Sequence, residues 1–378
     1  WQEYRYPFVY GQVDRTLFPV EQWRACSREA LALSAIDFWA ADRALDDDPM
    51  LVEMLCRHVL PQRGIFARRD EVMITLGSQH GIFLLSQLLL RAGDAVGVED
   101  PGYPDARNIF DARRAFIQRL AVDDRGLVLD ARAEAVLRKT TLVCVTPAHH
   151  CPTMVSLRDD RREKLLELAD REDFLIIEDD YDSEFRLTGK PIPALQSIDS
   201  ADRVIYMNTF SKSLASTIRI SYMVLPTALA EAFYKNLGFY ACTVSNLEQY
   251  TLAKFISEGY FEKHINRMRI RYKQKKDLIL KEMKRCGLLK LAKIDAEDAG
   301  LHFLLRSGRA HTYRFPPHLP LPLLHLLLLL PAWKTESWNM LQKSFRYIPL
   351  SVFGKFLPSS SPGLPDTLGH IPPAIPHW

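Results

Sequence analysis

Residues 204–214 read Val-Ile-Tyr-Met-Asn-Thr-Phe-Ser-Lys-Ser-Leu, an apolar strand-like stretch that is followed by a lysine among small hydroxyl residues. A buried lysine needs a physical reason, because desolvation disfavours its charge. One such reason is an imine between Lys212 and an aldehyde cofactor, with an acid nearby to hold a pyridinium nitrogen. Taken alone, a lysine after a strand is more often a solvated loop residue, so the interpretation depends on its neighbours.

Two neighbouring features favour the cofactor interpretation. Upstream, Glu178-Asp179-Asp180-Tyr181 directly follows a second apolar run at 174–177. Downstream, Arg219 follows Lys212 at a short spacing. Together, the paired acid and the downstream arginine make a buried, imine-forming lysine a better interpretation than a solvated loop residue.

The bulk composition is typical of a soluble globular protein, with 378 residues, 47% hydrophobic and 25% charged. This length allows two domains, or one large domain with an appendage. The net charge of +3 is too small to argue for nucleic acid or an anionic membrane. The longest apolar stretch, 319–333, is interrupted by prolines and falls short of the roughly 20 residues that a membrane span needs.

The six cysteines are scattered and show no Cys-x-x-Cys spacing. This pattern predicts reduced thiols in a reducing compartment, and therefore a cytoplasmic protein without a zinc site. No signal peptide opens the chain, and it begins with Trp1 rather than Met. We expect the natural start of the gene product to lie upstream.

Between about residues 70 and 226, short apolar segments alternate with helical patterns. Such alternation predicts an α/β fold with a mostly parallel sheet flanked by helices. Ligands collect at the carboxyl ends of the strands in such sheets, and every motif considered below follows a strand end. Strands are predicted at Glu71–Leu76, Ala95–Glu99, Thr141–Thr146, Phe174–Glu178, Arg203–Asn208 and Ile220–Leu225, and helices at Gly81–Arg91 and Asp159–Glu172.

The remaining chain divides into segments of different character. From Asn246 to about Lys284 the pattern is long, helical and rich in cations, which indicates a solvated helix face. Residues 307–378 hold 12 of the 23 prolines, and regular periodicity fades there. We predict an arm or interdomain linker at 1–60, a large cofactor-binding domain at 61–255, a connecting helix and the start of a small domain at 256–306, and an atypical, disordered or frameshifted tail at 307–378.

Several motifs, in their order and spacing, resemble one protein family. Residues 1–306 are similar to the aminotransferase-like domain of MocR-type regulators of the GntR family. That domain is a relative of the class I/II aminotransferases, pyridoxal-phosphate-dependent enzymes of fold type I. The motifs are Tyr6-Pro7-Phe8, Gly11-Gln12-Val13-Asp14, Phe18-Pro19 with Trp23, Gly77-Ser78-Gln79-His80, Glu99-Asp100-Pro101-Gly102-Tyr103-Pro104, Thr146-Pro147 with Pro152-Thr153, residues 178–186, residues 209–214 and Arg219-Ile220.

The resemblance implies pyridoxal 5'-phosphate as cofactor and gives each motif a role. Gly77, Ser78 and Gln79 would hold its phosphate at a helix N-terminus. Ser211 and Arg219 would add a hydroxyl donor and a fixed cation to the same phosphate. Tyr103 would stack on the ring.

Three further residues would carry the chemistry. Asp179 would pair with the pyridine nitrogen, with Asp180 as the neighbouring candidate, since the sequence does not settle the local geometry. Tyr181 would donate a hydrogen bond to the phenolic oxygen of the cofactor. Lys212 would form the imine and later move a proton.

The chain also departs from the family pattern. Cys151 and Met154 flank Pro152-Thr153 where an Asn or aromatic residue and a Gly are usual. After Leu301–Arg306 the pattern fades, apart from a brief return at Tyr347–Ser351, and no arginine is assigned to a substrate carboxylate. The small C-terminal domain therefore looks degenerate, through either gene decay or divergence.

Three functions remain open at this point. The chain could transfer amino groups between an amino acid and a 2-oxo acid, or sense an amino acid or amine as the effector domain of a regulator. It could also be an inactive remnant that keeps only the cofactor pocket. The resemblance implies a homodimer. No winged helix-turn-helix segment is present in these residues, so this chain alone is not expected to bind DNA.

Overall fold

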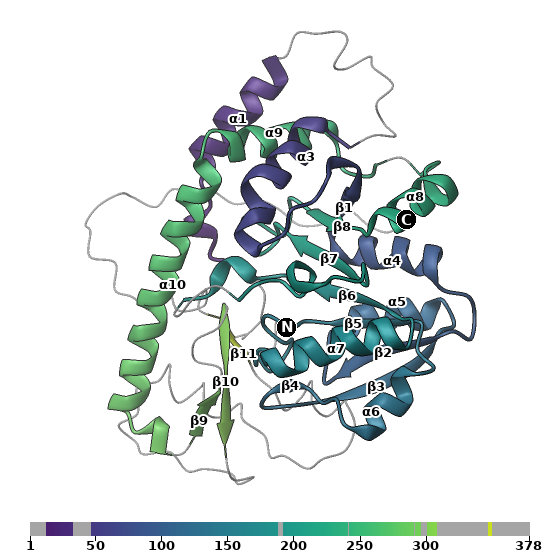
Figure 1. Cartoon of the computed structure of the whole chain (residues 1–378). Coiled ribbons are helices and arrows are strands. Elements are labelled where there is room, and N and C mark those ends of the chain that lie inside the picture. Colours follow the sequence, from purple (N-terminus) through teal and green to yellow (C-terminus); the bar gives the residue numbers. More distant parts are fainter. Residues whose placement is uncertain are drawn as a thin grey trace, which may run out of the picture.

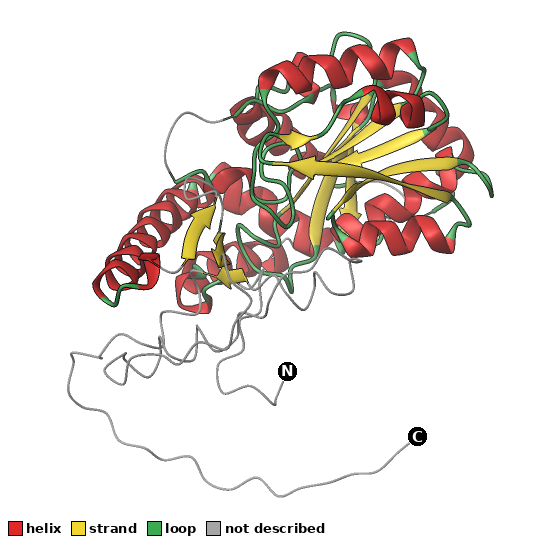
Figure 2. Ribbon diagram, turned by 90° about the horizontal axis from the view of Figure 1, so that it is seen from below, coloured by secondary structure: helices red, strands yellow, loops and turns green. Residues whose placement is uncertain are grey.

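A mixed eight-stranded sheet forms the body of the protein in this computed structural model, which describes residues 13–32, 47–187, 192–240, 242–290, 292–295, 301–307 and 347–349. The sheet is flanked by helices (Figures 1 and 2). The helices are α1 (Val20–Ala32), α3 (Pro49–Met54), α4 (Gly77–Leu89), α5 (Pro104–Ala112), α6 (Ala131–Leu137), α7 (Asp159–Arg171), α8 (Thr227–Leu237), α9 (Asn246–Ser257) and α10 (Tyr260–Arg285). The strands of the large sheet are β1 (Val72–Leu76), β2 (Ala95–Asp100), β3 (Phe116–Asp123), β4 (Gly126–Leu127), β5 (Leu142–Val145), β6 (Leu175–Asp179), β7 (Val204–Thr209) and β8 (Ile220–Val224).

The strand order across this sheet is β1-β8-β7-β6-β5-β2-β3-β4. Strands β7, β6, β5, β2 and β3 pair in parallel. Strand β8 runs antiparallel to both of its neighbours, β1 and β7. The predicted α/β class with a mostly parallel sheet is therefore confirmed.

The alternation of side chains along β7 shows how the layers are held together. All six residues of β7 are buried, as expected of a central strand covered on both faces. Ile205 and Met207 join the core formed with α4, α5 and α8. Tyr206 points to the opposite face and joins the core that includes α3, α9 and α10. Successive residues thus anchor opposite layers.

All six strands predicted from the sequence are present, each within one residue at either end. The predicted helices also form, although α4 begins earlier, at Gly77. Strand β3 was not predicted. Its residues are mostly exposed or half-buried and include polar side chains, so it lacks the apolar run that marks a buried strand.

The long helical pattern after Asn246 forms two helices rather than one. Gly259 separates α9 from α10 and has a φ of 68°, a left-handed conformation that glycine adopts without strain.

Helix α3 illustrates a start signal that the sequence also carries. Its N-cap, Asp48, accepts hydrogen bonds from the amides of Met50 and Leu51, and Pro49 occupies the first turn.

A second, three-stranded antiparallel sheet lies alongside α10 (Figures 1 and 2). It consists of β9 (Ala292–Asp295), β10 (His302–Ser307) and β11 (Tyr347–Pro349), with β10 in the centre. Strand β11 lies within the brief return of the family pattern. The rest of the predicted atypical tail, 308–346 and 350–378, lies outside the described residues, as do Tyr6–Phe8 and Gly11–Gln12. The domain boundaries stay a prediction.

Two searches of the described residues bear on other functions. No helix within them combines the length and the apolarity that a bilayer crossing requires. Among the same residues, no group of three or more His, Cys, Asp or Glu side chains is placed to hold a metal ion. All six cysteines are described, and none forms a disulfide bond.

Candidate functional site

The sequence motifs meet at one edge of the large sheet, where its parallel strands end. Gly77 follows β1, Tyr103 follows β2, Asp179 ends β6, and Lys212 follows β7. Arg219 precedes β8 instead. Because β8 runs antiparallel, its first residues lie beside the last residues of its neighbours, with Leu76 opposite Ile220 and Thr209 opposite Ser221. The reversed strand brings Arg219 to the shared edge.

A cavity of about 200 Å³ opens at this edge. Eight of the nine residues predicted to bind the cofactor line it, namely Ser78, Gln79, Tyr103, Asp179, Tyr181, Ser211, Lys212 and Arg219. Segments that are far apart in the sequence thus form one site. The cavity also has four lining residues that the sequence did not single out as site residues: Thr146, Cys151, Thr209 and Ser216.

Gly77, the ninth predicted residue, is not among the lining residues but directly precedes Ser78, which is. Its φ of 79° is in the left-handed region. A Cβ at this position would come within 2.6 Å of Arg219 Nη2. Glycine therefore allows the start of α4 and the guanidinium of Arg219 to approach each other, and Arg219 Nη2 donates to the carbonyl of Leu76 at 3.3 Å.

Lys212 is half-buried in the loop between β7 and β8. Burial lowers the pKa of its amine, while Cys151, Asp182 and Asp179 nearby act to raise it. A lowered pKa increases the fraction of neutral amine, which is the form that attacks an aldehyde and accepts a proton.

Asp179 faces the cavity as a buried carboxyl group, 5% exposed. Its Oδ1 has no hydrogen-bond partner among the described residues. Burial and the charges of Asp180 and Asp182 raise its pKa to about 7, although Lys212 acts in the opposite direction. An acid in this condition is disposed to accept a cationic or N–H partner.

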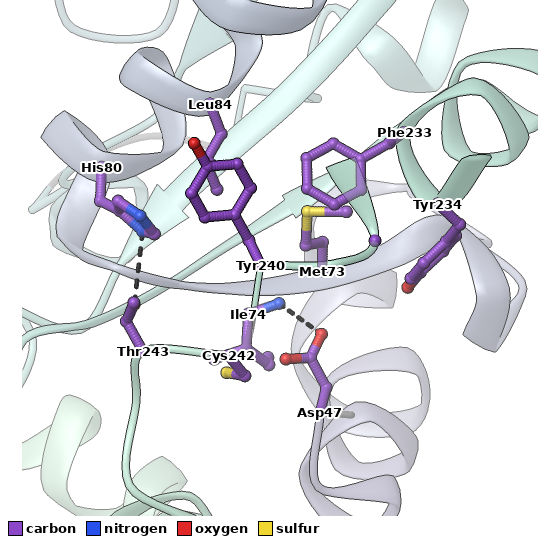
Figure 3. Close-up of a pocket in the computed structure, with 11 residues that line it drawn as sticks. Asp47, Met73, Ile74, His80, Leu84, Phe233, Tyr234, Tyr240, Cys242 and Thr243 are labelled. Atoms are coloured by element: carbon purple, nitrogen blue, oxygen red, sulfur yellow. Dashed lines mark hydrogen bonds between the residues drawn. The ribbon is translucent and has the colours of Figure 1, made fainter. Parts of the chain in front are cut away.

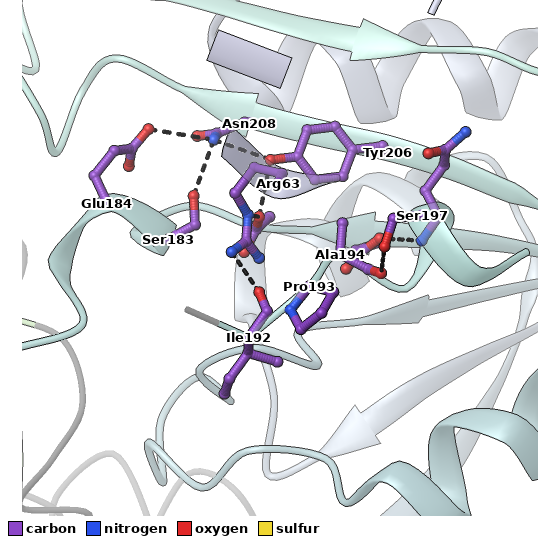
Figure 4. A network of polar contacts seen from close by, with 12 residues as sticks. Arg63, Ser183, Glu184, Ile192, Pro193, Ala194, Ser197, Tyr206 and Asn208 are labelled. Carbon is purple, nitrogen blue, oxygen red and sulfur yellow. Dashed lines mark hydrogen bonds and ion pairs between the residues drawn. The ribbon is translucent and has the colours of Figure 1, made fainter. Parts of the chain in front are cut away.

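Asp180 belongs to a different environment, a buried polar network shown in part in Figure 4. Its Oδ2 accepts hydrogen bonds from Arg63 Nε at 2.7 Å and from the Tyr206 hydroxyl at 2.8 Å. Arg63 also donates to the carbonyl of Ile192 at 2.5 Å, and Asn208 Nδ2 lies 3.2 Å from the Tyr206 oxygen. The geometry therefore favours Asp179 over Asp180 as the acid available to a ligand.

Two predicted binding residues are held by one carboxylate. Asp105 Oδ2 accepts from Gln79 Nε2 at 2.8 Å and from the Tyr103 hydroxyl at 3.1 Å. Burial and the nearby Asp105 raise the pKa of Tyr103, so its hydroxyl keeps its proton. This bridge joins the starts of α4 and α5 and holds the Tyr103 ring at the cavity.

The hydroxyl and guanidinium groups predicted to bind an anion differ in burial. The Ser211 amide donates to the Thr209 hydroxyl at 3.2 Å, and the hydroxyl oxygens of Thr209 and Ser211 are 2.9 Å apart. Ile218 and Ile220 are buried, yet Arg219 between them is exposed and has a φ of 57°. The burial of its two apolar neighbours therefore does not extend to the side chain of Arg219.

Thr146 and Cys151 complete the wall of the cavity on the β5 side. Thr146 donates to Glu99 Oε2 through its amide at 3.0 Å and its hydroxyl at 2.8 Å, and the Cys151 amide lies 3.1 Å from the Thr146 hydroxyl. Burial raises the pKa of Glu99 to about 8, although these hydrogen bonds act to lower it. Thr146 follows β5, so the strand-end rule that located Asp179 and Lys212 also points to it.

A separate and smaller cavity of about 70 Å³ lies between β1, α4, α8 and the segment after α8 (Figure 3). Met73, Leu84, Phe233 and Tyr240 are among its lining residues, which include none of the predicted site residues. Asp47 Oδ2 accepts from the Ile74 amide at 2.8 Å at its border. Its smaller volume, and the absence of the predicted site residues from its lining, distinguish it from the site at the sheet edge.

Comparison with known proteins gives a consistent result. The family model described as aminotransferase class I and II matches residues 47–306. The chain is 40% identical over 285 residues to the HTH-type transcriptional regulator TauR of Rhodobacter capsulatus. This match covers 75% of this chain and 58% of that protein. It is 33% identical over 309 residues to the probable rhizopine catabolism regulatory protein MocR of Rhizobium meliloti, covering 81% and 61%.

A solved structure extends the likeness to the fold. The kynurenine aminotransferase of Pyrococcus horikoshii superposes with a TM-score of 0.66 and 30% identity, covering 79% of this chain and 74% of that one. The chain therefore spans about three-fifths of each of the two regulators and about three-quarters of this enzyme.

Proposed function

The chain belongs to the aminotransferase class I and II family, most like the aminotransferase-like domain of MocR-type regulators, and on that premise we propose that it binds pyridoxal 5'-phosphate covalently through Lys212. We further propose that an amino acid or amine displaces Lys212 from the cofactor. One observation carries the proposal: Lys212 shares a cavity with Asp179, a buried acid whose Oδ1 has no partner among the described residues.

The phosphate end of the cofactor fits the start of α4. Backbone N–H groups in the first turn of a helix are without intrahelical partners, and the helix dipole favours an anion there. Gly77 leaves room for Arg219 beside this turn, and a side chain at Gly77 would displace the guanidinium. Ser78 and Ser211 line the same cavity and can add donors.

The ring end of the cofactor fits Asp179. A protonated pyridine nitrogen would supply the missing partner of Oδ1 and a positive charge to the buried carboxylate, which lowers the pKa of that group from its raised value. Tyr103 and Tyr181 line the cavity and supply an aromatic face and a hydroxyl. Tyr181 donates to Met154 Sδ at 3.5 Å, a weak bond that a better acceptor would replace.

When bound, the cofactor ring accepts the electrons released as a bond at the amino-bearing carbon of the ligand breaks. Asp179 would hold the ring nitrogen in its protonated form. Lys212, once displaced, would carry a proton to and from that carbon, because its lowered pKa leaves part of its amine neutral.

Amino-group transfer is the first candidate outcome of this exchange. The likeness to the kynurenine aminotransferase supports it, together with 31% identity over 220 residues to the aromatic-amino-acid aminotransferase 1 of Thermococcus litoralis. Turnover also needs a group that binds the carboxylate of the substrate. The sequence assigned no residue to this role.

Ligand sensing is the second candidate, and the regulator relatives favour it. In this case the chain would be the effector domain of a transcription regulator that binds the cofactor and a small amino compound without steady turnover. TauR and MocR match this chain over only part of their own lengths, as a shared effector domain would. A homodimer belongs to the proposal in either case.

One experiment tests cofactor binding and then separates the two outcomes. The purified chain is mixed with pyridoxal phosphate, and its visible absorbance is recorded before and after borohydride reduction, which fixes the cofactor to lysine. Mass analysis should locate the adduct at Lys212. A folded chain that yields no adduct would disprove the proposal. Addition of amino acids with a 2-oxo acid then shows exchange with turnover for an enzyme, or exchange without turnover for a sensor.

A further inference from the structure

Helix α10 contacts the backbone that carries Lys212. Its buried residue His264 is 2% exposed, and the His264 Nε2 lies 2.8 Å from the carbonyl oxygen of Ser213. Ser213 directly follows Lys212 and is fully buried. Since a buried carbonyl without a partner is costly, His264 supplies a hydrogen bond that this irregular loop needs.

The second ring nitrogen of His264 defines its tautomer. Arg267 Nη2 lies 3.3 Å from His264 Nδ1 and, as a guanidinium nitrogen, can only donate. Nδ1 must therefore accept, and the proton of the neutral ring lies on Nε2, where it is donated to Ser213. Burial lowers the pKa of His264 to about 4, although the hydrogen bond to Ser213 acts to raise it. The ring is therefore neutral at neutral pH.

The same arginine reaches the N-terminal part of the described chain. Arg267 Nη2 is 3.5 Å from the carbonyl oxygen of Leu17. Asp14, in the same segment, donates its amide to the Tyr272 hydroxyl at 3.0 Å and forms an ion pair with Lys275. One face of α10 thus holds residues 13–17, while His264 holds the Lys212 loop.

We propose that His264 is a positioning residue, which fixes the backbone of Lys212 through the Ser213 carbonyl and links it, through Arg267, to residues 13–17. This inference rests on the proposed function, because it concerns the position of the lysine that is proposed to bind the cofactor. Its physical basis is a continuous set of hydrogen bonds from Ser213 to Leu17 that passes through both ring nitrogens of a single histidine.

The loop between β7 and β8 shows why such a contact matters. Its other backbone hydrogen bonds run from the Leu214 amide to Phe210 at 2.8 Å, from the Phe210 amide to Ile220 at 3.0 Å and from the Ile218 amide to Ala215 at 3.2 Å. These bonds lie within the hairpin itself. His264 provides a contact from outside the hairpin, so a change in residues 13–17 can alter the direction of Lys212, and the reverse also holds.

Two variants at His264 separate positioning from general packing. His264→Leu removes both hydrogen bonds and keeps an apolar side chain of similar size. We expect cofactor affinity to fall by roughly tenfold or more, with a shift in the pH titration of the visible absorbance of the lysine-bound cofactor. His264→Gln retains an amide N–H that can reach Ser213, and should restore both properties to within about threefold of the wild type.

Gln249 on the neighbouring helix α9 offers a matched control. It is fully buried, donates to the Val244 carbonyl at 3.0 Å and accepts from the Asp48 amide at 2.9 Å, so it also joins separate segments through a donor and an acceptor. Gln249→Leu should destabilise the fold but leave the absorbance titration unchanged. If Gln249→Leu and His264→Leu shift the titration equally, the positioning role is disproved.

A measurement without cofactor tests the link to the N-terminal segment. Hydrogen exchange of the cofactor-free chain should become faster both in residues 210–219 and in residues 13–17 in His264→Leu, but not in His264→Gln. Faster exchange in residues 210–219 alone would disprove the link. Failure of the wild type to bind pyridoxal phosphate would disprove the proposed function. The hydrogen-exchange measurement would still decide whether residues 210–219 and residues 13–17 are linked through His264.

Discussion

Asp179 and Asp180 are adjacent acids at the end of β6, yet their surroundings are opposite in character. Asp180 does not line the cavity, and its Oδ2 is bound from within the protein by the guanidinium of Arg63 and the hydroxyl of Tyr206, although its Oδ1 has no hydrogen-bond partner among the described residues. Asp179 faces the cavity, and its Oδ1 has no partner among the described residues. Successive residues of an extended strand point to opposite faces, so one acid contributes to the fold and the other is exposed to a ligand.

The contrast shows how a stable fold can hold a costly site. A buried carboxyl group without a charge partner costs stability, which a bound cation would recover. The Arg63–Asp180–Tyr206 network lies next to it and fixes the backbone from the other side of the sheet. The proposed ligand binding and the stabilising network therefore belong to two neighbouring residues rather than to one.

The largest effect should follow from removal of Lys212, on the cavity side. Lys212→Ala is expected to abolish covalent cofactor binding completely, because no other lysine lines the cavity within the described residues. The free energy of unfolding of the cofactor-free chain should not fall, because the substitution removes an amine whose charged form is disfavoured by burial. Borohydride trapping and urea unfolding measure the two quantities, and a trapped adduct in the variant would contradict the assignment.

At Asp180 we expect a large effect on the stability of the fold rather than on cofactor binding. Asp180→Asn leaves Arg63 buried without its charge partner and should lower the free energy of unfolding by about 3–5 kcal/mol. Urea denaturation of the cofactor-free chain measures this. The double variant Arg63→Met/Asp180→Asn should lose less than the sum of the single variants, because they share one interaction. A loss below about 1 kcal/mol for Asp180→Asn would mean that the network does not hold the fold.

Asp179→Asn should separate stability from function. We expect the cofactor-free variant to gain about 1–2 kcal/mol at pH 8, where the wild type must bury a carboxylate. Proton transfer driven by amines should collapse, because the pyridine nitrogen loses its charge partner. If Asp180→Asn alone abolished this proton transfer in folded protein, the roles of the two acids would be exchanged.

The same carboxyl group predicts a pH dependence. The pKa of Asp179 is raised from an ordinary 3.8 to about 7. Between these values the folded chain holds a proton that the unfolded chain has released, so this contribution to stability is present below about pH 4 and is lost as the pH rises through 7. Unfolding free energies measured at pH 5.5 and pH 8 should therefore differ less in Asp179→Asn than in the wild type.

The smallest expected effect is at Arg219. Its guanidinium lines the cavity but is exposed, so solvent screens its attraction for a phosphate. Arg219→Ala should weaken cofactor affinity by about 1–2 kcal/mol, and Arg219→Lys by less. Fluorescence titration measures the affinities. An unchanged affinity in Arg219→Ala would remove this residue from the phosphate site.

Much of this arrangement could be predicted from the sequence, because buried parallel strands leave a strong local signal. The six apolar strands and the strand-end rule were enough to place Lys212 and Asp179 at one edge. The antiparallel direction of β8 and the exposure of Arg219 leave no such signal in the sequence, and neither was predicted. Arg63 was missed for a related reason: its partner is 117 residues away, and nothing in the neighbouring sequence indicates it.

The reversed strand β8 has a consequence for how the protein is made. Among the described strands, β1 pairs with β8 alone, and Leu76 and Arg219 are separated by 143 residues. Such distant pairing has a high entropic cost and tends to form late. A chain emerging from the ribosome therefore cannot assemble the proposed phosphate site until β8 has been synthesised, so any binding of the cofactor should follow completion of the large sheet rather than guide it.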